Sequence, residues 1–224
     1  MIIEEFIVTP FQQNARIVAC EKTGRAICID PGDEAARIAR ALDRNNLTLQ
    51  AIALTHAHMD HIGAVGALKR LKSDAEIILH RADEEIYHAL PEQPAWLGLP
   101  REAWSMLGVE YDAPPAVDRY WTEGEVYAVG NLRFEILHCP GHSPGHVALF
   151  ERRERKLFAG DCLFAGSIGR TDLAGGSMDE LLATIANKII PLGDDVTVYT
   201  GHGPATTIGH ERHTNPFLTG TPAF

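Results

Sequence analysis

Short runs of Val, Ile, Leu and Ala alternate along the chain with polar stretches rich in Gly, Pro and Asp. Apolar runs of this length, bounded by turn residues, are typical of β-strands. The strands expected on this pattern are Ile2–Val8, Ala15–Cys20, Ala26–Ile29, Ala51–Leu54, Glu76–Leu79, Glu125–Val129, Leu132–Leu137, Val147–Phe150, Leu157–Ala159 and Val196–Tyr199. Gly130-Asn131 separates two of them and predicts a tight turn.

Helical patterns lie between the expected strands. The segment from Glu34 to Asn45 follows Asp33, which we expect to be its N-cap, and a second helix is expected from Ile62 to Leu71. Ser177-Met-Asp-Glu180 has the spacing of a capping box before the apolar run 181–186. Helices inserted between strands indicate an α/β protein.

The stretch from Pro91 to Trp121 fits neither pattern clearly. It contains five prolines and three tryptophans. Long irregular segments often carry function, so one interpretation is a lid or a surface for a partner. Packing of the aromatic side chains over the core is the other.

Composition narrows the class of protein. A chain of 224 residues that is 45% hydrophobic can bury one sizeable core, so we expect a single domain over residues 1–224. The net charge of −10 argues against a nucleic-acid partner, because phosphate binding needs a clustered positive surface. No window approaches the ~18 apolar residues of a membrane helix, and the N-terminal residues lack a basic region before an apolar run. We therefore expect a soluble cytoplasmic protein with no membrane partner.

The four cysteines support the same location. Cys20, Cys28, Cys139 and Cys162 form no C-x-x-C motif, and three of them lie in or beside apolar runs. Buried, reduced thiols are the expectation for such residues in the cytoplasm.

The segment Thr55-His-Ala-His-Met-Asp-His61 directly follows an expected strand and has the composition of a metal site. In extended backbone, residues two apart project from the same side, so His56 and His58 can bind one ion together. Asp60 and His61 come after a bend, at the start of the expected helix, and can face a second ion. Imidazole and carboxylate groups are ligands of zinc, iron and manganese.

Two coordination spheres need further ligands, and candidates follow three later strands. His142 lies in Pro140-Gly-His-Ser-Pro-Gly145, Asp161 follows Gly160, and His202 lies between two glycines. We expect His56, His58 and His142 to hold one ion. The second ion is expected on Asp60, His61 and His202, with Asp161 bridging the two. The expected cofactor is therefore a pair of divalent metal ions, zinc first, with iron or manganese as alternatives.

In these motifs the chain resembles the metallo-β-lactamase superfamily, whose H-x-H-x-D-H motif, later His, bridging Asp and final His occur here in the same order. The resemblance implies a four-layer αββα sandwich. It also implies that Asp30 supports ligand histidines without binding metal itself. A turn residue in Asp-Pro-Gly is the alternative role for Asp30.

The branch of the superfamily depends on other residues. A bridging carboxylate such as Asp161 is implied for glyoxalase-like hydrolases, whereas the β-lactamases of this fold lack it. The segment from Gly160 to Asp172 resembles hydroxyacylglutathione hydrolase (glyoxalase II), in which a lysine at the position of Arg170 is implied to bind substrate. The tail segment 211–217 resembles short bacterial glyoxalase II-like proteins and leaves Arg212 as a second anion contact. A surface arginine is the alternative for Arg170.

The resemblance implies hydrolysis of a small-molecule thioester, such as the glutathione derivative S-lactoylglutathione. A metal-bound hydroxide would attack the carbonyl, with Asp60 and Asp161 as catalytic residues that hold the remaining proton. Only 22 residues follow His202, so we expect no C-terminal helical domain of the kind that holds glutathione in glyoxalase II. The oligomeric state stays open.

Other functions were weighed against this one. The Gly-Arg-Thr-Asp172 signature is shared with iron-dependent persulfide dioxygenases, which would use His56, His142 and Asp161. Hydrolysis of a lactone or another ester, and a non-catalytic scaffold, are further alternatives. A serine hydrolase built on Ser143 is disfavoured, because the oxyanion hole needs an N–H on the next residue and Pro144 has none.

Overall fold

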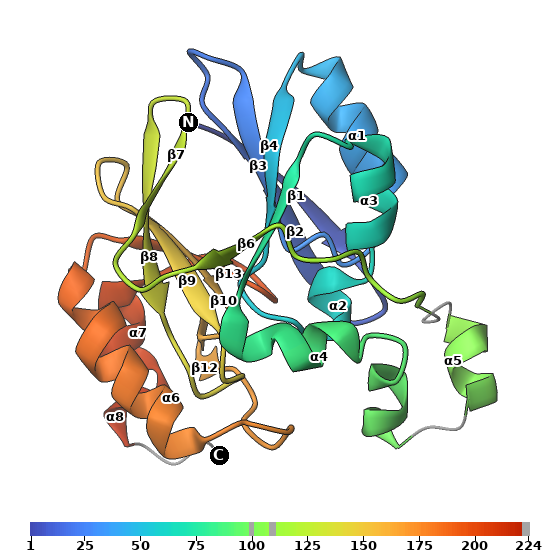
Figure 1. The fold of residues 1–224 in the computed structure, drawn as a ribbon. Coiled ribbons are helices and arrows are strands. Elements are labelled where there is room, and N and C mark those ends of the chain that lie inside the picture. Colours follow the sequence, from blue (N-terminus) through green and yellow to red (C-terminus); the bar gives the residue numbers. More distant parts are fainter. Residues whose placement is uncertain (99–100, 108–110, 221–224) are drawn as a thin grey trace.

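A computed structural model describes residues 1–98, 101–107 and 111–220. A six-stranded sheet forms the N-terminal half of its fold (Figure 1). Its strands, in spatial order, are β1 (Ile2–Val8), β2 (Gln13–Ala19), β3 (Arg25–Ile29), β4 (Thr48–Ala53), β5 (Glu76–His80) and β6 (Arg119–Trp121). The first three strands pair antiparallel, and β3 to β6 pair parallel. The carboxyl ends of four strands therefore meet at one edge of this sheet.

The second six-stranded sheet faces the first. In spatial order it contains β14 (Thr206–Thr207), β13 (Thr197–Thr200), β10 (Lys156–Gly160), β9 (Val147–Glu151), β8 (Leu132–His138) and β7 (Val126–Val129). Strands β10 and β13 pair parallel, whereas the other pairs are antiparallel. A short hairpin of β11 (Leu163–Phe164) and β12 (Ser167–Ile168) follows β10.

Helices cover the outer face of each sheet (Figure 1). On the first sheet lie α1 (Ala35–Arg44) and α3 (Val65–Leu71), and on the second lie α6 (Met178–Thr184) and α7 (Ile208–Thr214). The remaining helices and helical turns are α2 (Met59–Ile62), η1 (Arg81–Asp83), α4 (Glu84–His88), η2 (Gln93–Leu97), α5 (Arg101–Leu107), the π-helical η3 (Ile185–Ile189), η4 (Ile190–Leu192) and α8 (Pro216–Thr219).

Three buried apolar clusters fill the spaces between these layers. One joins the first sheet to its helices through residues such as Leu42 and Leu68, and a second lies between the sheets and includes Ile27 and Phe134. The third joins the second sheet to α6 and its continuation, with Leu181 at its centre. The order of layers is therefore helix, sheet, sheet, helix, which is the expected αββα sandwich. Within the described residues, no helix is long and apolar enough to cross a membrane.

Two predicted helices differ in detail from the structure. Asp33 does not cap α1: Glu34 occupies the N-cap position in left-handed backbone, and the Asp33 carboxylate accepts the N–H of Glu34. The helix predicted from Ile62 to Leu71 is interrupted near its start: α2 ends at Ile62, and α3 begins only at Val65, after Gly63 and Ala64. A Cβ atom at Gly63 would lie 2.5 Å from the carbonyl oxygen of Gly32, so the chain passes too closely there for a larger residue.

The segment from Pro91 to Trp121 contains more regular structure than the sequence predicted. It forms η2 and α5 and ends in β6, which adds a parallel strand to the first sheet. Trp104 and Trp121 are buried, whereas Trp96 is 41% exposed. Residues 99–100 and 108–110 of this segment lie outside the described part of the chain. Aromatic packing over the core thus accounts for two of its tryptophans, and Trp96 needs another explanation.

Candidate metal centre

Five of the candidate ligands lie on loops that leave the carboxyl ends of strands, and Asp60 and His61 lie in α2, which directly follows one of these loops. The His56 and His58 loop follows β4, the Asp161 loop follows β10, and the His202 loop follows β13. Because these strands are neighbours in parallel pairs or face one another across the sandwich, their carboxyl ends bring the loops to one edge of the molecule. His142 reaches the same edge from the loop between β8 and β9.

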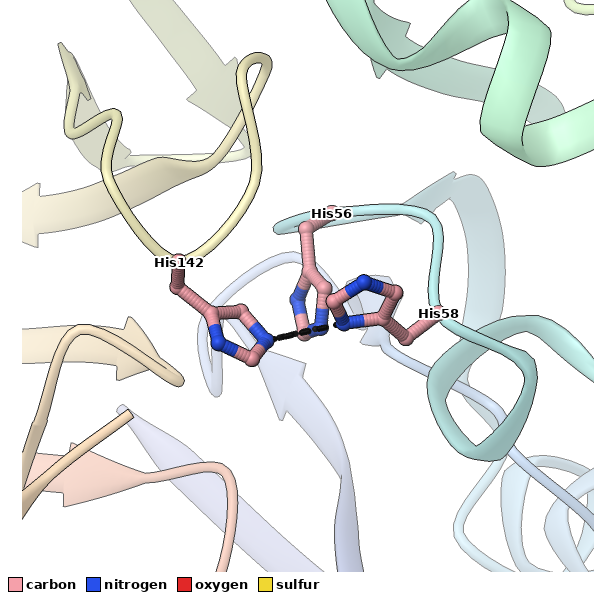
Figure 2. A group of neighbouring side chains, drawn as sticks. All are labelled: His56, His58 and His142. Atoms are coloured by element: carbon pink, nitrogen blue, oxygen red, sulfur yellow. Dashed lines mark hydrogen bonds between the residues drawn. The ribbon is translucent and has the colours of Figure 1, made fainter. Parts of the chain in front are cut away.

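His56, His58 and His142 form the first group, with their rings turned toward one another (Figure 2). The Nε2 atom of His142 lies 2.8 Å from Nδ1 of His58 and 3.2 Å from Nε2 of His56. All three side chains are buried. A hydrogen bond of 2.7 Å from Nδ1 of His142 to the carbonyl oxygen of Arg170 leaves the Nε2 lone pair facing the other two rings.

Asp60, His61 and His202 form the second group. Asp60 and His61 lie within α2, one turn earlier than the helix that the sequence predicted. The Oδ2 atom of Asp60 is 3.1 Å from Nε2 of His202 and 3.8 Å from Nε2 of His61. Nδ1 of His202 donates to the carbonyl oxygen of Phe11 at 3.0 Å, so Nε2 is the ring atom that faces Asp60 and could bind an ion.

Asp161 lies between the two groups. Its Oδ1 atom is 3.3 Å from Nε2 of His61, and its Oδ2 atom is 3.6 Å from Nε2 of both His142 and His202. The backbone N–H of Asp161 donates to Nε2 of His146, a buried histidine outside both groups. One carboxylate thus reaches ligands of both groups, which is the geometry that a bridging ligand requires.

The nitrogen and oxygen atoms of this site could bind metal cations, but they cannot all form hydrogen bonds with one another. Nε2 of His61 and Oδ1 of Asp161 are buried and, although they lie 3.3 Å apart, neither has a hydrogen-bond partner in favourable geometry. Buried polar atoms without a partner are costly, and a bound cation would satisfy both. Three imidazole nitrogens within 4.8 Å of one another likewise have more lone pairs than protons to share. The residues present therefore fit two divalent ions.

Burial and charge separate the two groups electrostatically. Burial lowers the pKa of His58 to about 3 and lowers the pKa of His56 well below its usual value, and neighbouring histidines add to both shifts. Burial acts in the same direction on His61, but the charges of Asp161 and Asp60 outweigh it and raise the pKa of His61 well above 6.5. Burial opposes ionisation of Asp161, yet the charge of His61 holds the pKa of Asp161 below its usual value. His56 and His58 are thus neutral before metal binds, whereas His61 carries a proton.

Asp30 contacts the candidate ligand His61, and the supporting role that the resemblance implies for it stays a prediction. Its Oδ2 atom is 3.0 Å from Nδ1 of His61 and accepts the hydroxyl of Thr55 at 2.6 Å, while its Oδ1 atom accepts the backbone N–H of Thr55 at 2.7 Å. Both carboxylate oxygens are thereby engaged, and Nε2 of His61 points to the second group. Asp30 also has a φ of 50°, so it turns the chain after β3 as the alternative role proposed.

Asp83 is a supporting residue that the sequence analysis did not find. Its carboxylate is fully buried and accepts three hydrogen bonds: from the backbone N–H of Ala57 at 3.0 Å, from the Ser143 hydroxyl at 2.7 Å and from the N–H of Gly145 at 2.5 Å. Burial raises the pKa of Asp83, although these donors oppose the shift. Ala57 separates His56 from His58, and Ser143 follows His142. Asp83 therefore joins the two loops that carry the first group.

Gln93 is the second supporting residue that sequence reasoning missed. Its amide nitrogen donates to the carbonyl oxygen of Ala57 at 2.8 Å, and its amide oxygen accepts the N–H of Met59 at 2.7 Å. These two contacts hold the backbone on both sides of His58. The sequence offered one signal for Asp83, an acidic residue soon after a strand end, and none for Gln93.

A cavity of about 430 Å³ opens over the two groups. Its polar lining includes His58, Asp60, His142, Asp161 and His202. Arg170 also lines it and is half-exposed, with its guanidinium bound by two hydrogen bonds of 2.7 and 2.8 Å to Asp172. Arg212 is not brought to this cavity, because it pairs with Asp194 on the surface at 3.1 Å.

Ser143 and the cysteines take structural positions. The Ser143 hydroxyl is fully buried against Asp83, which agrees with its rejection as a nucleophile. All four cysteines are buried free thiols.

The sequence model of the family described as "Metallo-beta-lactamase superfamily" matches residues 8–202 of the chain. The chain is 40% identical over 219 residues to a protein named hydroxyacylglutathione hydrolase GloC from Haemophilus influenzae, covering 97% of this chain and 98% of the relative. Among solved structures, it resembles the BLEG-1 B3 metallo-beta-lactamase with a TM-score of 0.85 and 39% identity, over 97% of this chain and 100% of that one. It also resembles TTHA1623 in a di-iron-bound form with a TM-score of 0.82 and 37% identity, over 96% of this chain and 100% of that one.

Proposed function

The chain belongs to the metallo-β-lactamase superfamily, and we propose that it is a dinuclear metal-dependent hydrolase that cleaves thioesters such as S-lactoylglutathione. One observation carries the proposal: Asp161 reaches ligands of two separate groups that open into the same cavity. The name of the Haemophilus influenzae relative supports the choice of a thioester.

The seven ligands would divide between two divalent ions. His56, His58 and His142 would hold one ion, and the second would be held by Asp60, His61 and His202, with Asp161 shared. Zinc is our first expectation, and iron is the alternative that the di-iron form of TTHA1623 supports. Bound divalent ions supply an activated water and polarise a carbonyl group at neutral pH.

The chain's own residues supply the remaining chemistry. Asp60 and Asp161 line the cavity, and we expect one of these carboxylates to take up the proton lost by the attacking water. Arg170 offers one cation at the cavity wall for an anionic substrate group. Thiolates leave readily without a dedicated acid, so the described lining needs no further proton donor.

Thiol release under anaerobic conditions tests this proposal. The metal-loaded protein should cleave S-lactoylglutathione equally well with and without oxygen, because hydrolysis consumes only water. Oxygen uptake with glutathione persulfide, and no anaerobic thiol release, would instead establish a persulfide dioxygenase. A chromogenic β-lactam belongs in the same experiment, since one structural relative is named a B3 metallo-beta-lactamase. Faster cleavage of that β-lactam than of any thioester would replace the proposed substrate class.

A further inference from the structure

Besides Met59, which lies between two ligands in the sequence, six apolar side chains line the cavity that contains the metal-binding residues. They are Phe11, Trp96, Leu97, Phe164, Ile168 and Leu173, here named the apolar wall. They come from four separate parts of the chain: the loop after β1, the turn η2, the β11–β12 hairpin and the loop that follows it. A cavity lined by both ionisable and apolar side chains fits a ligand that has both kinds of surface.

The apolar wall begins beside the metal-binding residues themselves. The carbonyl oxygen of Phe11 accepts the hydrogen bond from His202, and the ring of Phe164 lies edge-on to the His202 ring at 6.0 Å. A substrate whose reacting carbonyl is near His202 would therefore place its adjoining group on these rings.

Trp96 leaves a large apolar surface unburied in this cavity. Its side chain is 41% exposed, and that of Phe11 is 36% exposed, although Trp104 and Trp121 are buried. Gln93 fixes the turn that carries Trp96 by three hydrogen bonds to the backbone, so the position of this turn is set by the fold. When an apolar ligand covers exposed aromatic surface in a cavity, binding is stabilised by about 25 cal/mol for each Å² of apolar surface buried.

The cavity has little to offer a highly charged substrate. Among the described residues that line it, Arg170 is the one lysine or arginine, and its guanidinium is already engaged by the carboxylate of Asp172. The two carboxylates of a glutathione moiety would compete with Asp172 for this single cation.

We infer that the preferred substrates are thioesters with an uncharged, apolar group next to the reacting bond, held on the apolar wall in preference to a lactoyl or glutathionyl group. The inference rests on the proposed function and narrows its substrate class. The reaction is RC(O)SR′ + H₂O → RCOOH + R′SH, in which the carbon–sulfur bond breaks with its electrons on sulfur and a carbon–oxygen bond to water forms. The apolar group can be R or R′, since either adjoins the carbonyl.

Four thioesters separate these possibilities: S-lactoylglutathione, S-hexanoylglutathione, and the lactoyl and hexanoyl thioesters of benzyl mercaptan. Each kcat/KM is divided by the rate of alkaline hydrolysis of the same compound, which removes differences in intrinsic reactivity. An apolar group on either side should raise this ratio at least about tenfold over S-lactoylglutathione, the gain from burying about two methylene groups. The acyl and thiol arms show which side the wall holds.

Variants of the wall test its role directly. Trp96→Ala should remove most of the advantage of the apolar substrates, Trp96→Phe should retain it, and Met106→Ala, an 89% exposed apolar residue outside the cavity lining, should leave all ratios unchanged. Trp96→Ala should also weaken calorimetric binding of S-benzyl-N-acetylcysteamine, a thioether that cannot be hydrolysed, to the metal-depleted protein.

The outcomes distinguish this inference from the proposed function. S-lactoylglutathione cleaved as well as the apolar compounds, or an advantage that survives Trp96→Ala, would overturn the inference and leave the thioesterase standing. Cleavage of none of the four compounds by protein loaded with two metals would overturn the proposed function and this inference with it.

Discussion

Replacing Asp83 by asparagine should weaken both the fold and its hold on metal. The buried carboxylate accepts backbone N–H groups on both sides, Gly145 at Oδ1 and Ala57 at Oδ2. An asparagine in the same place has one oxygen and one NH₂ group. In either orientation of its amide, the NH₂ group therefore faces a backbone N–H, and both are donors. Asp83→Asn therefore leaves at least one buried N–H without an acceptor.

The structure sets the size of this effect. A buried donor without a partner costs about 1–3 kcal/mol, so the free energy of unfolding should fall by that amount. The loops that Asp83 joins carry His56, His58 and His142, and loss of such supporting contacts weakens metal binding by about 10- to 100-fold. Ser143→Ala is the matched control, because it removes one of the three hydrogen bonds and leaves no backbone donor unpaired. It should cost about 0.5–1.5 kcal/mol and leave metal affinity close to that of the original protein.

Two measurements check this prediction. Urea unfolding of the metal-depleted proteins gives the stability difference, and competition with a chromophoric chelator gives metal affinity. If Asp83→Asn binds both ions as tightly as the Ser143→Ala protein does, the contacts of Asp83 do not position the ligand loops and the reasoning fails.

Two further predictions follow from the roles of the ligands. Asp161→Ala should lose the bridging contact, one ion and nearly all hydrolytic activity. Ser143→Ala should keep most activity, because its hydroxyl is not the nucleophile. Equal inactivation of both variants with metals retained would refute the assignment. Uptake of metal by the second group should release protons, because the pKa values of both His61 and His202 are raised in the metal-free protein, whereas His58, with a pKa of about 3, releases none near neutral pH. Since a protonated imidazole cannot bind metal, the affinity of the second group should rise with pH, by up to about tenfold per unit for each proton released, and should level off once the pH exceeds the raised pKa values of His61 and His202. Titration in weak buffer with a pH dye, on the original protein and on His61→Ala, checks this, and a pH-independent affinity would contradict it.

The sequence predicted those residues whose chemical type and position after a strand are themselves characteristic of a metal site. The seven candidate ligands are histidines and aspartates at strand ends, and the structure brings them together at one edge of the sandwich. That they hold metal stays a prediction. The αββα layers were expected from the resemblance and are found in the structure.

Residues whose role depends on burial could not be predicted in this way. Asp83 and Gln93 are types common on protein surfaces, and only the packing of distant segments encloses them beside Ala57. The break at Gly63 likewise depends on the close passage of Gly32, which the local helical pattern does not contain. The sequence predicted Asp33 as the N-cap of α1, but Glu34, in left-handed backbone, occupies that position. Local propensity is a weak guide wherever tertiary contacts set the backbone.

The metal content of the purified protein tests the central claim most directly. Elemental analysis after growth with added zinc or iron should find close to two transition-metal ions per chain, and His202→Ala should reduce the value toward one while leaving the group of His56, His58 and His142 filled. Saturation at one ion per chain, iron alone, with no change in His202→Ala, would contradict the dinuclear site and favour the dioxygenase.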